Sequence, residues 1–170
     1  MSIFCKILVA IDRSAMSRQS FNAALALAKA TGANLLLLHV LSLGDEECPR
    51  MPALVGEDFH LKGSSQSVLQ IYEDLWKAYE TRGLTLLQSL ADEAIAGGIT
   101  VELDQVLGKP GPAICDYASQ SGVDLIMMGR QSSSGLNELL MGSVSNYVLH
   151  HAPCSVLVVH QQPKRTEHCK

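Results

Sequence analysis

The sequence is poor in charged and aromatic residues. Charged residues make up 18% of the 170 residues and aromatic residues 5%, whereas hydrophobic residues reach 47%. This balance is typical of a compact, well-buried α/β domain rather than of a disordered or coiled-coil protein. The net charge is −4, and lysine and arginine are scattered, with one adjacent pair at Lys164 and Arg165, so no basic stripe is present. The composition therefore predicts that the protein binds neither nucleic acid nor a membrane surface.

Long apolar runs and paired cysteines are also lacking. No run approaches the ~20 residues that a membrane span needs, and the N-terminus lacks the layout of a signal peptide. The five cysteines, Cys5, Cys48, Cys115, Cys154 and Cys169, show no C-x-x-C spacing. That pattern indicates neither a disulfide framework nor a zinc knuckle. We expect a cytoplasmic protein with reduced thiols.

Apolar runs alternate with amphipathic stretches along the chain. Strands are expected at Lys6–Ile11, Asn34–Val40, Ile99–Val106, Asp124–Met128 and Ser155–His160. Helices are expected from Ser17 to Gly32, from Ser67 to Ala96, around residues 114–118 and from Ser143 to His151. This alternation predicts an α/β fold: a three-layer sandwich of four helices around a five-stranded, mostly parallel sheet.

The longest predicted helix carries an apolar stripe that is expected to face the core. Its members are Leu69, Tyr72, Trp76, Tyr79, Leu87, Leu90 and Ala94. The segment 41–66 before it is irregular and rich in glycine and proline, and long loops of this kind are often mobile or functional. We predict that this insertion borders a ligand site or a partner surface. We expect one domain over residues 1–160 and a disordered polar tail over 161–170.

A glycine-rich stretch, 129–143, follows the fourth predicted strand and leads into a helix. It carries Gly129, Gly135 and Gly142 and ends in Ser143 at the helix start. Glycines let backbone N–H groups approach an anion, and a helix N-terminus supplies free donors, so the stretch has the parts of a phosphate cradle. Glycines also mark ordinary turns, and the stretch alone favours the turn.

The position of this stretch in the predicted sheet favours the cradle. With the strand order 3-2-1-4-5, the winding reverses between the first and fourth strands, and ligands bind in the crevice at that point. Asp12 flanks the crevice on one side and Gly129 on the other. Asp12 alone is equally compatible with a loop or capping residue. Because two separate features meet there, we predict a phosphate-binding loop.

The chain also resembles the universal stress proteins along nearly its whole length. The resemblance is carried by Lys6–Asp12, Met128–Gly129, Leu140–Val144, His150–Cys154 and Val156–Val159. The nucleotide-binding branch of that family carries the motif G-x2-G-x9-G-S/T. Gly129, Ser132, Gly142 and Ser143 keep its spacing, with Ser132 in place of the second glycine. The resemblance implies the adenine nucleotide alpha hydrolase-like fold.

The resemblance implies a site for ATP or a related adenine nucleotide. Ala10, Ile11 and Asp12 would lie beside the adenosine, Val40 against the adenine, Met128 and Gly129 near the ribose, and Gly142, Ser143 and Val144 at the phosphates. Arg13 and Arg130 are expected near the phosphates, with a solvated loop charge as the alternative for either, and the Ser132 hydroxyl could bond a phosphate or the ribose. The resemblance also implies that Asp12 helps to hold a divalent cation, Mg²⁺.

The family further implies a homodimer. The strand 155–160 is apolar, and such an edge strand would be an exposed pairing template, which symmetric pairing across a two-fold axis would cover. A covering loop or tail is the alternative.

Two functions from different classes remain open. The first is a dimeric, adenine-nucleotide-binding regulatory or stress-response protein with at most slow ATP hydrolysis. The sequence offers no positioned base, arginine finger or Walker lysine, so efficient phosphoryl transfer lacks its usual parts and no dedicated catalytic activity is expected. The second is a nucleotide-free interaction module of the same family, which Ser132 supports.

Overall fold

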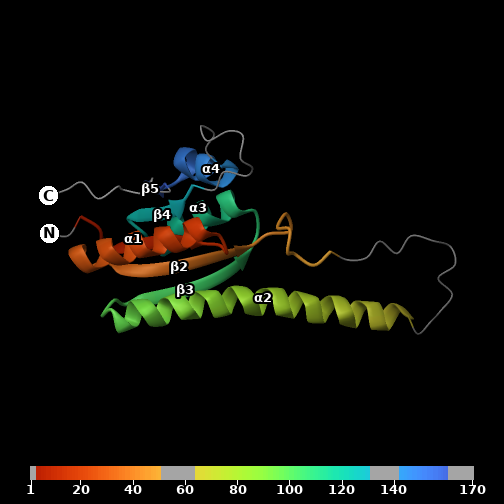
Figure 1. Ribbon diagram of the computed structural model, residues 1–170. Helices are drawn as coiled ribbons and strands as arrows, with labels where there is room; N and C mark the ends of the chain where they lie inside the picture. Colours follow the sequence, from red (N-terminus) through yellow and green to blue (C-terminus); the bar gives the residue numbers. More distant parts are fainter. Residues whose placement is uncertain (1–2, 51–63, 131–141, 161–170) are drawn as a thin grey trace, which may run out of the picture.

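The computed structural model describes residues 3–50, 64–130 and 142–160 (Figure 1). In chain order the elements are β1 (Lys6–Ile11), α1 (Ala15–Thr31), β2 (Asn34–Leu41), α2 (Ser64–Ala96), β3 (Val101–Leu107), α3 (Pro110–Ser121), β4 (Leu125–Gly129), α4 (Ser143–His151) and β5 (Ser155–Val159). The predicted alternation of strands and helices is therefore confirmed. The predicted tail 161–170 and residues 51–63 of the predicted insertion lie outside the described residues.

The sheet is parallel throughout, with strand order β3-β2-β1-β4-β5. β1 lies in the centre, where Ile7 is in register with Leu35 of β2 on one side and with Leu125 of β4 on the other. β3 and β5 are the edge strands. The predicted order is confirmed, and the chain reverses its winding between β1 and β4.

Successive residues of the central strands point to opposite faces of the sheet and build two cores. Ile7 and Val9 pack with α1 and α2, whereas Leu8 packs with α3 and α4. Two helices therefore cover each face (Figure 1). Continuous apolar runs are the pattern expected of parallel strands that are buried on both sides.

Side-chain caps set several element boundaries. α1 begins at Ala15, two residues earlier than predicted, because the Ser14 hydroxyl accepts a hydrogen bond from the N–H of Ser17 at 3.1 Å. Gly32 ends α1 with a positive φ of 73°, as predicted. Asp124 lies before β4 rather than in it, and its carboxylate accepts hydrogen bonds from the N–H groups of Cys5 and Lys6. These bonds lower the pKa of Asp124.

The predicted core stripe of α2 is correct only for the C-terminal part of the helix. Tyr79, Leu87, Leu90 and Ala94 are buried, but Leu69 is 48% exposed. The prediction was wrong at Leu69 because the N-terminal part of α2 extends beyond the end of the sheet (Figure 1). Periodicity identifies one side of a helix, but it does not say how far the sheet continues beneath that side.

Gly83 brings the backbone of α2 close to the sheet. A Cβ atom at this position would lie 2.1 Å from Nε2 of Gln105 and 2.6 Å from Nδ1 of His39. A larger residue here would have to displace the side chains of Gln105 and His39, which accounts for a residue that is unfavourable inside a helix. Among the described helices, none is long and apolar enough to cross a lipid bilayer.

Candidate functional site

A cavity of about 730 Å³ opens at the carboxyl ends of β1, β2 and β4. The start of α4 and the segment 42–47 complete its rim. Of the residues predicted from the sequence to form a site, the cavity is lined by Ala10, Ile11, Asp12, Val40, Met128, Gly129, Gly142, Ser143 and Val144. The fold therefore brings together residues from four separate parts of the chain at the switch point of the sheet.

Two predicted residues do not join this group. Arg130 is not among the described residues that line the cavity; its N–H donates to the carbonyl of Val159, and its Nη1 lies 3.3 Å from Nδ1 of His160. Arg130 thus contacts the β5 side of the sheet. Ser132 lies outside the described residues.

The start of α4 lies at the cavity. Its N-cap is Gly142, with φ −58° and ψ 150°, and no side chain among the residues that the structure describes caps this helix end. The first backbone N–H groups of a helix have no partner within the helix and carry a partial positive charge. Because Gly142, Ser143 and Val144 line the cavity, this end can receive an anion.

Gly129 has a structural requirement of its own. A Cβ atom there would lie 2.9 Å from Cβ of Met16 and 3.1 Å from the backbone carbonyl oxygen of the same residue. The close approach of β4 and α1 therefore demands glycine, whether or not a ligand binds. By contrast, the backbone angles of Gly142 suit any residue.

Asp12 is tied to the N-terminus of α1. Its Oδ1 accepts hydrogen bonds from the N–H of Ser14 at 2.9 Å and from the Ser14 hydroxyl at 2.5 Å. The N–H of Asp12 itself donates to the hydroxyl of Ser17. Among the residues with described positions, no group of three or more His, Cys, Asp or Glu side chains could hold a metal ion. A cation at Asp12 would therefore need oxygen ligands from a nucleotide or from water.

His39 is a lining residue that the sequence analysis missed. It is only 5% exposed, and its Nδ1 lies 2.9 Å from Nε2 of Gln105. Burial lowers the pKa of His39, although the carboxylates of Asp12 and Asp45 partly oppose this effect. A histidine inside the otherwise apolar run of β2, directly before Val40, was the signal available in the sequence.

The segment 42–47 forms an acidic wall of the cavity, which we define as Asp45, Glu46 and Glu47. Glu47 pairs with Arg13, and Arg82 of α2 lies 4.0 Å from the same carboxylate. The hydroxyl of Tyr79 donates to Oδ2 of Asp45 at 2.9 Å. This described part of the predicted insertion does border the cavity.

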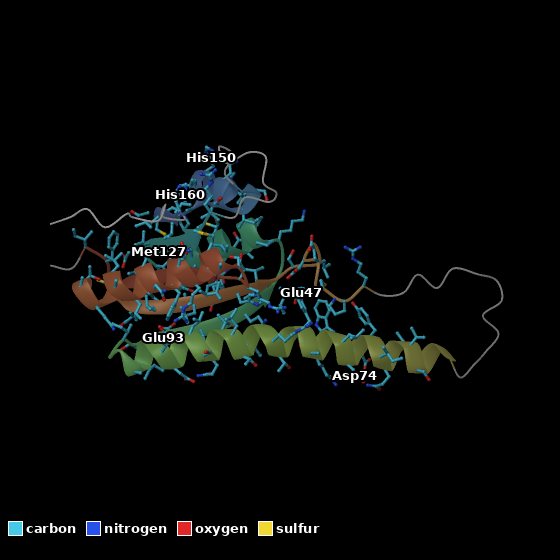
Figure 2. All side chains as sticks on the ribbon, in the orientation of Figure 1. Glu47, Asp74, Glu93, Met127, His150 and His160 are labelled. Carbon is cyan, nitrogen blue, oxygen red and sulfur yellow. The ribbon has the colours of Figure 1, made fainter. Side chains whose placement is uncertain are left out.

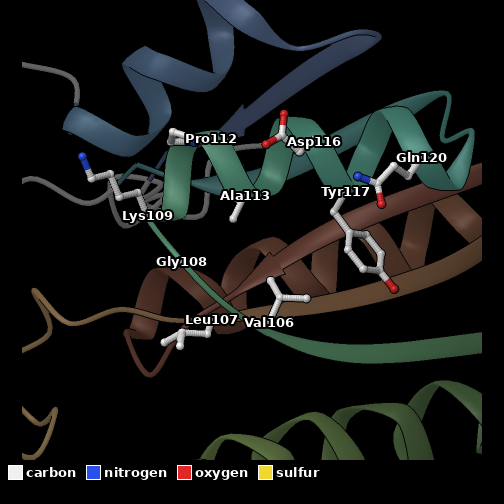
Figure 3. A pocket seen from close by; sticks show the side chains of 9 residues that line it. All are labelled: Val106, Leu107, Gly108, Lys109, Pro112, Ala113, Asp116, Tyr117 and Gln120. Carbon is white, nitrogen blue, oxygen red and sulfur yellow. The ribbon is translucent and has the colours of Figure 1, made fainter.

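A second hollow lies between the end of β3 and α3 (Figure 3). It has a volume of about 430 Å³, and Leu107, Lys109, Asp116 and Tyr117 are among its lining residues. The Tyr117 hydroxyl donates to Oδ2 of Asp104 at 2.6 Å. None of the predicted site residues lies here.

Comparison with known proteins assigns the family. The sequence profile of the universal stress protein family matches residues 4–160. The chain belongs to the universal stress protein family. It is 32% identical to the universal stress protein Sll1388 of Synechocystis over 154 residues, which are 91% of this chain and 96% of that protein. It is 33% identical to YxiE of Bacillus subtilis over 157 residues, 92% of this chain and 99% of the other.

Solved structures of low sequence identity share the fold. The universal stress protein family protein from Arabidopsis thaliana, crystallised with AMP bound, superposes with a TM-score of 0.63 at 19% identity, covering 96% of each chain. A universal stress protein in complex with cAMP gives a TM-score of 0.59 at 21% identity, covering 92% of this chain and 97% of the other. The protein MJ0577 gives 0.71 at 23% identity, covering 95% and 99%.

Proposed function

We propose that this universal stress protein binds an adenine nucleotide in the cavity at the switch point and acts as a regulatory protein. The main support is the convergence of Asp12, Val40 and Gly129 with the uncapped start of α4 on one cavity. Two proteins of the same fold were crystallised with AMP and cAMP, which adds support for an adenine ligand.

In this proposal the two ends of the nucleotide use different parts of the cavity. Val40 and Met128 belong to or pack against the apolar core beneath α3 and α4, and they offer a surface for the base. Ser143 offers a hydroxyl and, with Val144, backbone N–H groups at the start of α4 for a phosphate. Ile11, Asp12 and Gly129 line the same cavity at the carboxyl ends of β1 and β4.

The same residues suit binding better than catalysis. If Mg²⁺ accompanies the ligand, Asp12 is the carboxylate that would hold it together with phosphate oxygens, and the ion would neutralise phosphate charge. Asp12 is already engaged by Ser14, and Arg13 by Glu47. We therefore propose at most slow ATP hydrolysis.

We also propose a homodimer that pairs through β5. This strand is at the edge of the sheet, and Leu157 is 39% exposed on it. An apolar edge strand favours pairing with a second copy. The variant Leu157→Asp should convert the dimer to a monomer in light scattering after size-exclusion chromatography. A wild-type protein that is already monomeric would contradict the proposal.

A nucleotide-free interaction module is the second candidate function. Its specific support is the packing of Gly129 against Met16, because this glycine is explained without any ligand. Ser132, where the nucleotide-binding motif has glycine, supports it as well.

One experiment separates the two functions. The purified protein is denatured and the released small molecules are identified by mass spectrometry, and ATP, AMP and cAMP are titrated calorimetrically into the ligand-free protein. We expect an adenine nucleotide to bind. The variant Gly142→Val should remove binding while the circular dichroism spectrum stays unchanged, because the branched side chain fills the space for the phosphate. Absence of binding at millimolar concentrations of all three nucleotides would support the module instead.

A further inference from the structure

The charges around the cavity are unusual for a site that holds several phosphates. Among the described lining residues, four carry carboxylates, Asp12 and the three members of the acidic wall, whereas Arg13 is the one permanent cation. His39 is neutral at pH 7 because burial lowers its pKa.

The one permanent cation among the described lining residues is already engaged. Arg13 pairs with Glu47, so a phosphate must compete with that carboxylate for the guanidinium. Arg82 also lies near Glu47, at 4.0 Å, but it is not among the described lining residues. A phosphate beyond the first would therefore add negative charge to a cavity whose described lining offers no further permanent cation.

The acidic wall is fixed in place. The turn is closed by hydrogen bonds from the N–H of Asp45 to the carbonyl of Ser42 and from the N–H of Cys48 to the carbonyl of Asp45. Cys48 and Tyr79 are buried together with Leu41, which anchors the segment to α2. Because Tyr79 also holds the carboxylate of Asp45, the wall cannot move away from a ligand without losing these contacts.

We propose that the acidic wall sets the number of phosphates that the site accepts, so that AMP or cAMP binds more tightly than ATP when no divalent cation is present. This inference rests on the proposed nucleotide-binding function. The open start of α4 offers donors for a single phosphate, and each additional phosphate places further negative charge in a cavity already lined by Asp45, Glu46 and Glu47. The wall thereby acts as a specificity determinant.

The test compares AMP and ATP by calorimetry in buffer with a chelator, for the wild type and two matched variants. Glu47→Gln removes the carboxylate that pairs with Arg13. Glu93→Gln removes an equally exposed carboxylate that pairs with Arg18 and lies far from Glu47 (Figure 2). Glutamine keeps the shape of glutamate, so both variants should fold, which circular dichroism verifies.

We expect the wild type to bind AMP about tenfold more tightly than ATP at low salt. This ratio should shrink about fivefold in Glu47→Gln and stay unchanged in Glu93→Gln, and it should also shrink in 0.5 M NaCl because the charges are screened. Equal or tighter binding of ATP by the wild type, or an unchanged ratio in Glu47→Gln, would overturn the inference while leaving nucleotide binding intact. If no nucleotide binds, the proposed function fails and the inference with it.

Discussion

The N-termini of α1 and α4 border the same cavity, and they differ in how they are capped. At α1, Ser14 caps the helix, and the hydroxyls of Ser14 and Ser17 also bond Asp12. At α4, Gly142 provides no side chain, and within the described part of the chain no side chain caps the backbone donors of the first turn. The α1 end satisfies its own polar groups, whereas the α4 end can accept an anion. An unfilled cap is therefore more informative about a ligand than the mere presence of a helix start.

The largest effect is expected from capping the open end. Gly142→Asp places a carboxylate at the N-cap of α4, where the backbone angles accept any residue. The carboxylate should increase stability by about 0.5 kcal/mol because it caps the helix and complements its dipole. It should weaken nucleotide binding at least about 100-fold because it occupies and repels the phosphate. Thermal unfolding and calorimetry measure the two effects; a parallel loss of both would contradict this account.

Removing the existing cap of α1 should lower the stability of the fold and leave nucleotide affinity nearly unchanged. Ser14→Ala deletes the hydroxyl that accepts from Ser17, and we expect a loss of about 1 kcal/mol of stability from urea unfolding. Nucleotide affinity should change by less than about twofold, since the α1 end donates nothing to the phosphate in our proposal. Ser14→Thr, which keeps a hydroxyl, should retain most of the stability. A loss of affinity as large as that of Gly142→Asp would make the two helix ends equivalent.

The acidic wall can be freed from α2 by removing the hydrogen bond between Tyr79 and Asp45. Tyr79→Phe removes the hydroxyl that donates to Asp45 and should cost about 1 kcal/mol in the free energy of unfolding. Burial and the hydrogen bond to Asp45 raise the pKa of Tyr79 to about 12. The pKa in the folded state is thus higher than in the unfolded chain, so this contribution is complete below pH 10 and is lost as the pH rises toward 12.

Tyr117 provides the comparison for this experiment. Burial and a hydrogen bond to Asp104 also raise its pKa to about 12, but it lies at the hollow beside α3. Tyrosinate absorbance should show late-ionising tyrosines in the wild type and one fewer in either Phe variant. Of the two, only Tyr79→Phe should change the ratio of AMP to ATP affinity. An equal change in Tyr117→Phe would mean that the ratio of AMP to ATP affinity responds to a general loss of stability and not to the acidic wall.

The smallest expected effect is that of His39 on the pH dependence of stability. Burial lowers the pKa of His39 below the value of 6.5 in the unfolded chain. Its contribution to stability is therefore present above pH 6.5 and is lost as the pH falls through the folded-state pKa. His39→Gln should make the free energy of unfolding less dependent on pH below 6.5. An identical slope in the wild type and the variant would show that His39 carries none of this dependence.

The sequence predicted the strand ends that form the site better than it predicted the acidic wall at its rim. Apolar runs indicate buried parallel strands, and the reversal of winding follows from their order, so Asp12 and Gly129 could be placed at one crevice. The acidic wall was not predicted because its position depends on contacts with residues distant in sequence. Glu47 pairs with Arg13, and Asp45 accepts a hydrogen bond from Tyr79. The error at Leu69 has the same origin, since the end of the sheet is a tertiary property.

Gly83 is a point at which α2 packs closely against His39 and Gln105 of the sheet. The backbone of the helix lies so close to the side chains of His39 and Gln105 at this residue that a Cβ atom would clash with both. From Gly83 to its start at Ser64 the helix extends for about 28 Å. A tilt of the helix by about 5° about Gly83 would therefore displace its first residue by about 2.5 Å, so the packing at this one glycine determines where the far end of α2 lies.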